Sequence, residues 1–167
     1  MTKSIVITGA SKGIGRAAAD ALAEQGWTVI GVARSAPQCF PGEFISADLG
    51  DQDQTGALAN ELAARGNVLG IVNNVGLDKH ETIDAVELRV FTAVMDLNVR
   101  PALQLTQALL PGMRSARFGR IINVTSLVTR GFAFRVAAAI TFLAGEKAGF
   151  ITGQTLFIDG GASLGSL

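Results

Sequence analysis

Residues 8–15, with the sequence Thr-Gly-Ala-Ser-Lys-Gly-Ile-Gly, place three glycines between two segments of regular pattern. The apolar run before them, residues 4–7, predicts a buried strand, and the Ala-rich segment 16–23 has helical spacing. A strand, a glycine-rich turn and a helix in this order are the layout of a dinucleotide site. An ordinary tight turn is the simpler alternative, but both flanking segments favour the binding site.

Each glycine of this loop has its own expected role. Gly9 lets the chain turn sharply off the strand, where a Cβ would clash. Gly13 allows the backbone to approach a pyrophosphate closely, and Gly15 lets the helix pack tightly on the strand. The helix N-terminus then offers free N–H groups and a positive dipole end to the phosphates. The spacing is Gly-x-x-x-Gly-x-Gly, which differs from the standard Gly-x-Gly-x-x-Gly fingerprint.

The whole chain alternates predicted strands and predicted helices. Its 167 residues suffice for one domain, 1–167, with a substantial core, and 49% hydrophobic against 17% charged residues suits a sheet covered on both faces. The alternation predicts an α/β fold with a doubly wound parallel sheet and right-handed crossovers. The predicted strands are 3–8, 27–33, 43–47, 68–73, 119–127 and 155–159. The predicted helices are 13–25, 51–65, 85–113 and 136–147.

The long predicted helix 85–113 contains Pro101. A proline there frees the carbonyl of Leu97, four residues back, because proline has no N–H to donate. We therefore expect a kink near Asn98.

Charge and hydropathy argue against several partners. The formal net charge is zero and no run of Lys or Arg occurs, so we expect neither nucleic acid nor an anionic membrane as the main partner. The longest apolar stretch, 136–145, is too short to span a bilayer, and the first strand begins too early for a signal peptide. A single cysteine, Cys39, cannot form an internal disulfide, which fits a reducing cytoplasm.

Four motifs together resemble the short-chain dehydrogenase/reductase family, and its 3-oxoacyl-carrier-protein reductases in particular. The motifs are the glycine loop, Asn-Asn-Val-Gly at 73–76, Asn-Val-Thr-Ser at 123–126, and the 151–153 and 159–161 segments. The resemblance runs from end to end except for one break after Arg135. It implies a Rossmann-like, three-layer α/β/α fold and hydride transfer between a nicotinamide and a small-molecule carbonyl or alcohol. It also implies a homodimer or homotetramer.

The resemblance implies a set of cofactor-binding residues along the strand ends. Ala33 stands where an acidic residue would select NAD, and Arg34 follows it, with Lys12 in the glycine loop. Two cations and no carboxylate favour a 2′-phosphate, hence NADP over NAD, although each cation alone reads as a solvated surface charge. The full predicted set is Gly9, Ser11, Lys12, Gly13, Ile14, Gly15, Arg34, Asp48, Leu49, Asn73 and Asn74.

Four of these residues also have simpler interpretations. In similar reductases a dipeptide like Asp48-Leu49 contacts the adenine, but an Asp can equally start a turn before the helix at 51. The amides of Asn73 and Asn74 can line the cofactor cleft, or they can mainly tie neighbouring strands together.

Two catalytic residues are implied by the resemblance, and no metal site is. Ser126 matches the family serine that holds the substrate oxygen, and Asn98 matches the asparagine that holds the main chain that positions a proton-relay water. Without the resemblance, Ser126 reads as a strand-end turn residue and Asn98 as an exposed helical residue.

The catalytic Tyr-x-x-x-Lys pair has no counterpart in this sequence, which contains no tyrosine. The family's catalytic helix and sixth strand are missing between Arg135 and Val136. Either a segment of a longer active reductase is unobserved there, or the deletion is real and the protein is a non-catalytic nucleotide-binding or interaction module. A positioned general acid or base supplies about 10²–10⁴-fold in rate, so this chain should be nearly inactive.

Overall fold

The computed structural model describes residues 2–79, 81–125 and 133–164. Its strands are β1 (Ser4–Thr8), β2 (Thr28–Ala33), β3 (Glu43–Ser46), β4 (Val68–Asn73) and β5 (Arg120–Asn123). Its α-helices are α1 (Gly13–Glu24), α2 (Gln52–Ala64), α3 (Leu88–Asn98), α4 (Arg100–Ser115) and α5 (Ala133–Ala144). Two short 3₁₀ helices, Glu146–Ala148 and Ala162–Leu164, follow α5.

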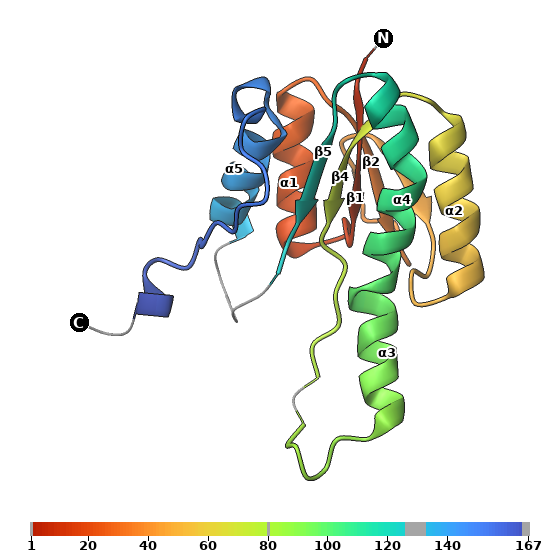
Figure 1. Cartoon of the computed structure of the whole chain (residues 1–167), viewed down its shortest axis with the longest axis vertical. Helices are drawn as coiled ribbons and strands as arrows, with labels where there is room; N and C mark the ends of the chain where they lie inside the picture. The colour runs from red at the N-terminus through yellow and green to blue at the C-terminus, as the bar shows by residue number, and fades with distance from the viewer. Residues whose placement is uncertain (1, 80, 126–132, 165–167) are drawn as a thin grey trace.

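The five strands form one parallel sheet in the order β3-β2-β1-β4-β5. Helices α1 and α5 pack together on one face of the sheet, and α2 and α4 pack together on the other (Figure 1). The predicted α/β fold with a parallel sheet is therefore confirmed. The sheet reverses its winding between β1 and β4, where open parallel sheets bind ligands beyond the strand ends.

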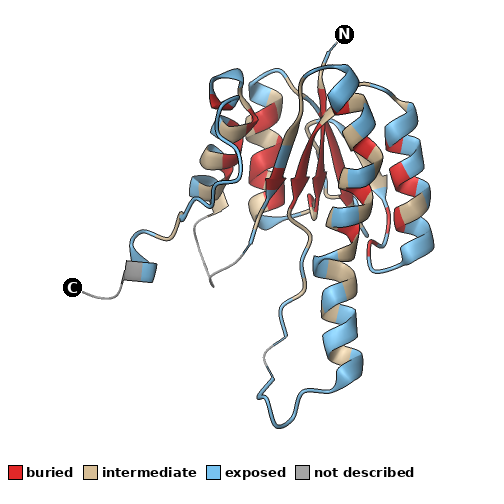
Figure 2. Ribbon diagram, viewed as in Figure 1, coloured by how far each residue is buried: buried red, intermediate tan, exposed pale blue. Residues whose placement is uncertain are grey.

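Apolar side chains fill both interfaces between the sheet and its helices. Ile5, Ile7 and Leu22 belong to the core on the α1 side, while Val6 and Ile30 belong to the core on the α2 side. The alternation of β1 side chains between the two cores shows that both of its faces are covered. Figure 2 shows this burial concentrated in the central strands.

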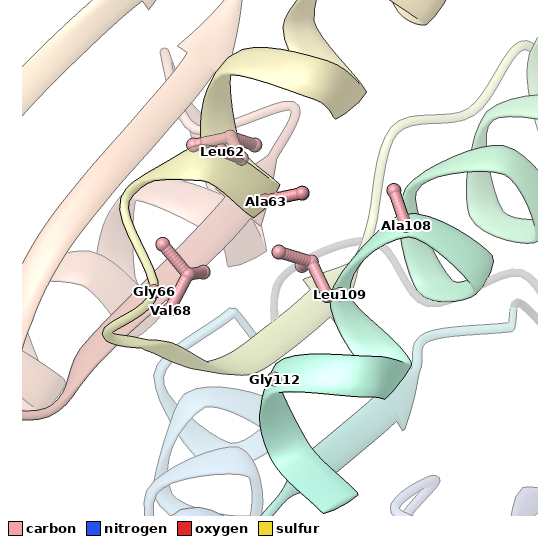
Figure 3. A pocket seen from close by; sticks show the side chains of 7 residues that line it. All are labelled: Leu62, Ala63, Gly66, Val68, Ala108, Leu109 and Gly112. Carbon is pink, nitrogen blue, oxygen red and sulfur yellow. The ribbon is translucent and has the colours of Figure 1, made fainter. Parts of the chain in front are cut away.

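The packing between α2 and α4 leaves one very small void. It has a volume of about 10 Å³. Figure 3 shows the side chains around it, which come from the end of α2, the start of β4 and α4. A void of this size with apolar walls is at the lower limit for a single water molecule. It is a shallow gap at the α2–α4 interface, because Ala63 and Gly66 beside it are exposed.

The helix predicted at 85–113 is two helices, and the expected kink is a break at Val99. Val99 lies between the two helices as the C-cap of α3 and the N-cap of α4, with φ −117° and ψ −50°. Pro101, in the first turn of α4, explains the break because it has no N–H to donate to the carbonyl of Leu97, while its fixed φ suits the start of a new helix. Helix α3 contains no buried residue and projects beyond the carboxyl ends of the strands (Figure 1).

The prediction of a strand at 155–159 was wrong. Residues 151–157 are exposed, and the segment carries no strand pairing among the described residues. The segment does not pair with the outer edge of β5, the last strand of the described sheet, because apolar composition alone does not form a ladder. The strand predicted at 119–127 is also shorter, since β5 ends at Asn123.

The junction between Arg135 and Val136 lies inside a helix. Helix α5 begins at Ala133 and runs through both residues without interruption, and η1 (Glu146–Ala148) follows it. The helix predicted at 136–147 therefore starts three residues earlier and ends three residues earlier. The structure joins β5 to α5 through residues 126–132, which lie outside its described part.

The connection from β2 to β3 crosses the sheet without a helix. Residues 34–42 form this crossover, and the ring of Phe40 packs against the backbone of Gly31 in β2. A Cβ at Gly31 would lie 2.4 Å from Cζ of Phe40, so the glycine makes room for the ring. Phe44 meets Phe40 edge to face at 5.1 Å, and the two rings cover the α1 side of the sheet edge. Arg16 of α1 donates a hydrogen bond to the carbonyl of Gln38 and so closes the loop over this cluster.

In the part of the chain that the structure describes, no helix combines the length and the apolar character that crossing a membrane requires.

Candidate functional site

The glycine loop lies at the carboxyl end of β1, as predicted. Gly9 and Gly13 have φ of +68° and +60°, a conformation that residues with a Cβ rarely adopt. A Cβ at Gly15 would lie only 2.4 Å from the carbonyl oxygen of Gly9. Gly9 and Gly15 thus have the geometry expected of them: Gly9 turns the chain, and Gly15 lets α1 pack directly on that turn.

The N-terminus of α1 is open. The residue before it, Lys12, makes no side-chain cap, and the first turn contains no acidic residue. A Cβ at Gly13 would meet no described atom within 4 Å. Unpaired N–H groups at a helix N-terminus attract anions, and open space lets an anion reach them. These residues fit the diphosphate of a dinucleotide.

Thr8 joins the glycine loop to the end of β4. Its buried hydroxyl accepts hydrogen bonds from the backbone N–H groups of Asn74 and Val75, at 2.9 and 3.0 Å. In return, Nδ2 of Asn74 donates to the carbonyl oxygen of Thr8 at 2.9 Å and of Gly9 at 3.3 Å. The first and fourth strand ends are therefore fixed relative to each other. Asn74 thus ties neighbouring strands together, which is one of the two roles that the sequence allowed for it.

Asn73 makes the corresponding link from β4 to β5. Its Nδ2 donates to Oδ1 of Asn123 at 2.8 Å and to the hydroxyl of Thr106, on α4, at 3.4 Å. Asn73 is 7% exposed, and its Oδ1 has no hydrogen-bond partner among the described residues. The side chain thus ties β4, β5 and α4 together and does not point freely into a cleft.

Lys12 and Arg34, the two cations predicted to recognise a 2′-phosphate, are both exposed. Arg34 directly follows β2, and Lys12 directly precedes α1. Both positions border the carboxyl ends of β1 and β2, which are hydrogen-bonded neighbours. The side chains are accessible to a ligand at this edge. Ser11, in the glycine loop, and Ile14, in the first turn of α1, are both half-buried.

Asp48 and Leu49 lie in a tight turn between β3 and α2. The carboxylate of Asp48 accepts a hydrogen bond from the N–H of Gly50 at 2.9 Å. This bond is what the simpler interpretation of Asp48, as a residue that starts a turn, leads us to expect. Asp51 then caps α2 by accepting from the N–H groups of Asp53 and Gln54, and these bonds lower the pKa of Asp51. The turn is therefore held from within, with the Leu49 side chain buried beneath it.

Asn98 clamps the loop that follows β4. Its Oδ1 accepts from the N–H of Leu77 at 2.7 Å, and its Nδ2 donates to the carbonyl of Leu77 at 2.9 Å. These two bonds use both polar atoms of the side-chain amide. Asn98 is the last residue of α3 and lies next to the break at Val99. Ser126, the other predicted catalytic residue, lies outside the described residues.

Several residues of this edge were not singled out from the sequence. Thr8 could have been, because a hydroxyl that closes an apolar strand and is followed by glycine is a candidate for a buried hydrogen bond. Thr106, Asn123 and Arg100 gave no such signal, because polar residues on a helix or at a strand end usually face solvent.

A family model described as short chain dehydrogenase matches residues 3–138. An uncharacterized oxidoreductase of Mycobacterium tuberculosis is 34% identical over 155 residues, which cover 83% of this chain and 46% of that protein. A 3-oxoacyl-[acyl-carrier-protein] reductase of Vibrio harveyi is 33% identical over 159 residues, covering 89% of this chain and 63% of the relative. The chain thus spans only about half to two thirds of the length of these relatives.

A solved structure supports the same relationship. The crystal structure of a short-chain dehydrogenase from Streptomyces avermitilis is 34% identical to this chain, with a TM-score of 0.68. The similarity covers 86% of this chain and 58% of that one.

Proposed function

Because the chain belongs to the short-chain dehydrogenase family, we propose that it is part of an NADP(H)-dependent oxidoreductase that interconverts a small carbonyl compound and an alcohol. The observation that carries the proposal is the open N-terminus of α1 behind Gly9, Gly13 and Gly15. This arrangement places unpaired N–H donors and a positive dipole end where a diphosphate would bind.

The preference for NADP over NAD is supported by the charges at the ends of β1 and β2. Lys12 and Arg34 are exposed there, and Ala33 provides no carboxylate to accept the ribose hydroxyls. A 2′-phosphate would gain charge-assisted hydrogen bonds from one or both cations. Asp48 and Leu49 are proposed to border the adenine, and Asn73 and Asn74 to fix the strand ends beneath the nicotinamide half.

The nicotinamide, when bound, supplies or accepts the hydride. Ser126 is proposed to hold the substrate oxygen by a hydrogen bond, and Asn98 to hold the main chain that positions a proton-relay water, through its bonds to Leu77. A proton must reach or leave that oxygen as the hydride moves, and the chain has no tyrosine to carry it. We therefore expect turnover to be lower by about 10²–10⁴-fold than with a positioned acid or base.

A second candidate function is a nucleotide-binding or interaction module without catalysis. It is favoured by the course of the chain after β5, where α5 comes next and no further strand follows among the described residues. Such a module would keep the carboxyl edge of the sheet proposed to bind the cofactor, and it would lack the Tyr-x-x-x-Lys pair that transfers the proton.

Cofactor titration tests the first proposal. NADPH and NADH are each titrated against the parent and Arg34→Ala by calorimetry. We expect tighter binding of NADPH by the parent and a selective loss of that preference in Arg34→Ala, with NADH affinity little changed. Equal binding of the two cofactors by the parent would refute NADP specificity, and binding of neither would refute the nucleotide site itself.

Activity separates the two candidate functions. NADPH oxidation is followed with an activated ketone, for the parent and for Ser126→Ala. Slow turnover that Ser126→Ala abolishes supports the oxidoreductase. Binding of NADPH with no turnover above the ketone-free rate supports the non-catalytic nucleotide-binding module.

We also propose that the chain self-associates through α3 and α4. Large apolar side chains are exposed along these helices at helical spacing, namely Leu88, Phe91, Met95, Val99 and Leu103. An exposed apolar stripe of this kind marks an interaction surface. Light scattering should give a dimer or tetramer for the parent and a smaller species for the double variant Phe91→Glu, Met95→Glu. A monomeric parent at high concentration would contradict this.

A further inference from the structure

The break between α3 and α4 places two polar side chains on either side of Val99. Asn98 bonds the backbone of Leu77, in the loop after β4. Arg100 reaches the backbone of Leu49 and Gly50, in the turn after β3. One helix junction therefore contacts two separate loops at the carboxyl edge of the sheet.

Arg100 is partly buried, with 19% of its side chain exposed. Its Nη2 donates to the carbonyl oxygen of Gly50 at 2.6 Å and lies 3.5 Å from that of Leu49. Its Nη1 donates to Gln104 at 2.9 Å, and its Nε lies 3.4 Å from a carboxylate oxygen of Asp96. The two α-helical partners, one turn away on each side, orient the guanidinium so that its remaining donor faces the turn.

The turn that Arg100 contacts is the one proposed to border the adenine. Its other hydrogen bonds come from its own residues or from α2, through Asp48, Gln54 and Thr55. Those bonds set the shape of the turn. The bond from Arg100 instead comes from α4, and it fixes where the turn lies relative to that helix.

We propose that Arg100 is a positioning residue that holds the Asp48–Leu49 turn against the adenine half of the cofactor. This inference rests on the proposed function, because it assigns the turn to adenine binding. A guanidinium bonded to a backbone carbonyl fixes position without itself touching the ligand. Loss of that bond should loosen the turn and weaken cofactor binding, with the remainder of the sheet edge unchanged.

The test compares Arg100→Met, which keeps the apolar stem, with Arg100→Lys, which keeps a charged donor. Arg114→Met, an exposed arginine at the end of α4, is the matched control. NADPH and 2′,5′-ADP, which carries only the adenine half, are titrated by calorimetry against the full chain. Hydrogen exchange of the amides at 48–51 and the emission of Trp27, the only tryptophan, at the far end of the sheet, are measured alongside.

We expect Arg100→Met to weaken NADPH and 2′,5′-ADP by the same factor, about tenfold, which corresponds to one charge-assisted hydrogen bond. Exchange at 48–51 should rise, Arg100→Lys should recover part of the affinity, and Arg114→Met should match the parent. A merely structural role would lower the number of binding sites and change Trp27 emission while leaving the dissociation constant unaltered.

Two results would overturn the inference. One is unchanged affinity of Arg100→Met for both ligands, and the other is weakened NADPH with unchanged 2′,5′-ADP. Failure of the proposed function looks different, because the parent itself would then bind neither ligand.

Discussion

The first and fifth strands belong to the same sheet but are packed very differently. All five residues of β1 are buried, whereas only Ile122 of the four residues of β5 is. Beyond β5, residues 149–157 are exposed throughout, including Phe150, Leu156 and Phe157. Helix α5, which follows β5, still packs against α1 and contributes Ala137, Ile140 and Ala144 to the core, whereas none of residues 149–163 is buried. The strand ends that carry the proposed cofactor site therefore belong to the well-packed part of the molecule, and the exposed part follows α5.

The largest expected effect is a difference between two leucine substitutions. Leu22→Ala, at a fully buried site on α1, should lower the free energy of unfolding by about 2–5 kcal/mol. Leu156→Ala, at a site 58% exposed, should change it by less than about 0.5 kcal/mol. Urea unfolding measures both. Comparable losses at the two sites would show that the region after β5 is packed as tightly as the region before it.

A smaller effect is expected at the glycine loop. Gly15→Ala puts a Cβ 2.4 Å from the carbonyl oxygen of Gly9, so α1 must move, at a cost of about 1–3 kcal/mol. NADPH affinity should fall as well, because the helix N-terminus moves with it. Gly56→Ala in α2 is the control, since its Cβ meets nothing and a helical Gly→Ala change stabilises by about 0.5–1 kcal/mol. A stabilised Gly15→Ala would be incompatible with the described packing.

The link between the two regions is the third target. Asn73→Ala removes the hydrogen bonds to Asn123 and Thr106, each worth about 1 kcal/mol. Hydrogen exchange should rise in β5 and stay unchanged in β1 and β2. Asn67→Ala, just before β4, serves as the comparison, because Asn67 takes part through its backbone carbonyl. Uniform exchange across the sheet would mean that the two regions unfold together.

The smallest effect concerns a surface ion pair in the well-packed half. Hydrogen bonds from Arg65 lower the pKa of Glu43 below its ordinary 4.5, so the pair stabilises the fold when Glu43 is ionised. The stability lost in Glu43→Gln should be constant from neutral pH down to about 4.5 and then shrink as pH falls through the folded pKa. Half-exposed pairs contribute about 0–1 kcal/mol, so the difference is small.

The sequence predicted the well-packed half closely. Strand β4 has the predicted bounds, 68–73, and Gly26 and Gly66 both end their helices with positive φ. The local hydrophobic pattern was sufficient for β4, because this strand has a neighbour on both sides and contributes side chains to both cores. The strand predicted at 155–159 failed for the opposite reason: its apolar residues match a strand, but pairing depends on a neighbour that local pattern does not specify.

The candidate site divides in the same way. The glycine geometry follows from residues adjacent in the chain, and it was predicted. The contacts of Asn98 with Leu77, and of Arg100 with Gly50, join residues 21 and 50 positions apart. No periodicity within either segment indicates such a partner. Ser126 and the proposed roles of the cofactor residues stay predictions.

The Phe40 ring that lies over Gly31 has a consequence for how this chain can vary. Position 31 holds no side chain because position 40 holds a large one, so the two sites share a single volume. A chain with alanine or valine at 31 would need a smaller residue at 40, and each change alone would leave either a clash or a hole. Because the loop that Phe40 holds begins at Arg34, a change at this pair would also move the cation that we propose for the 2′-phosphate. Positions 31 and 40 should therefore vary together among related sequences.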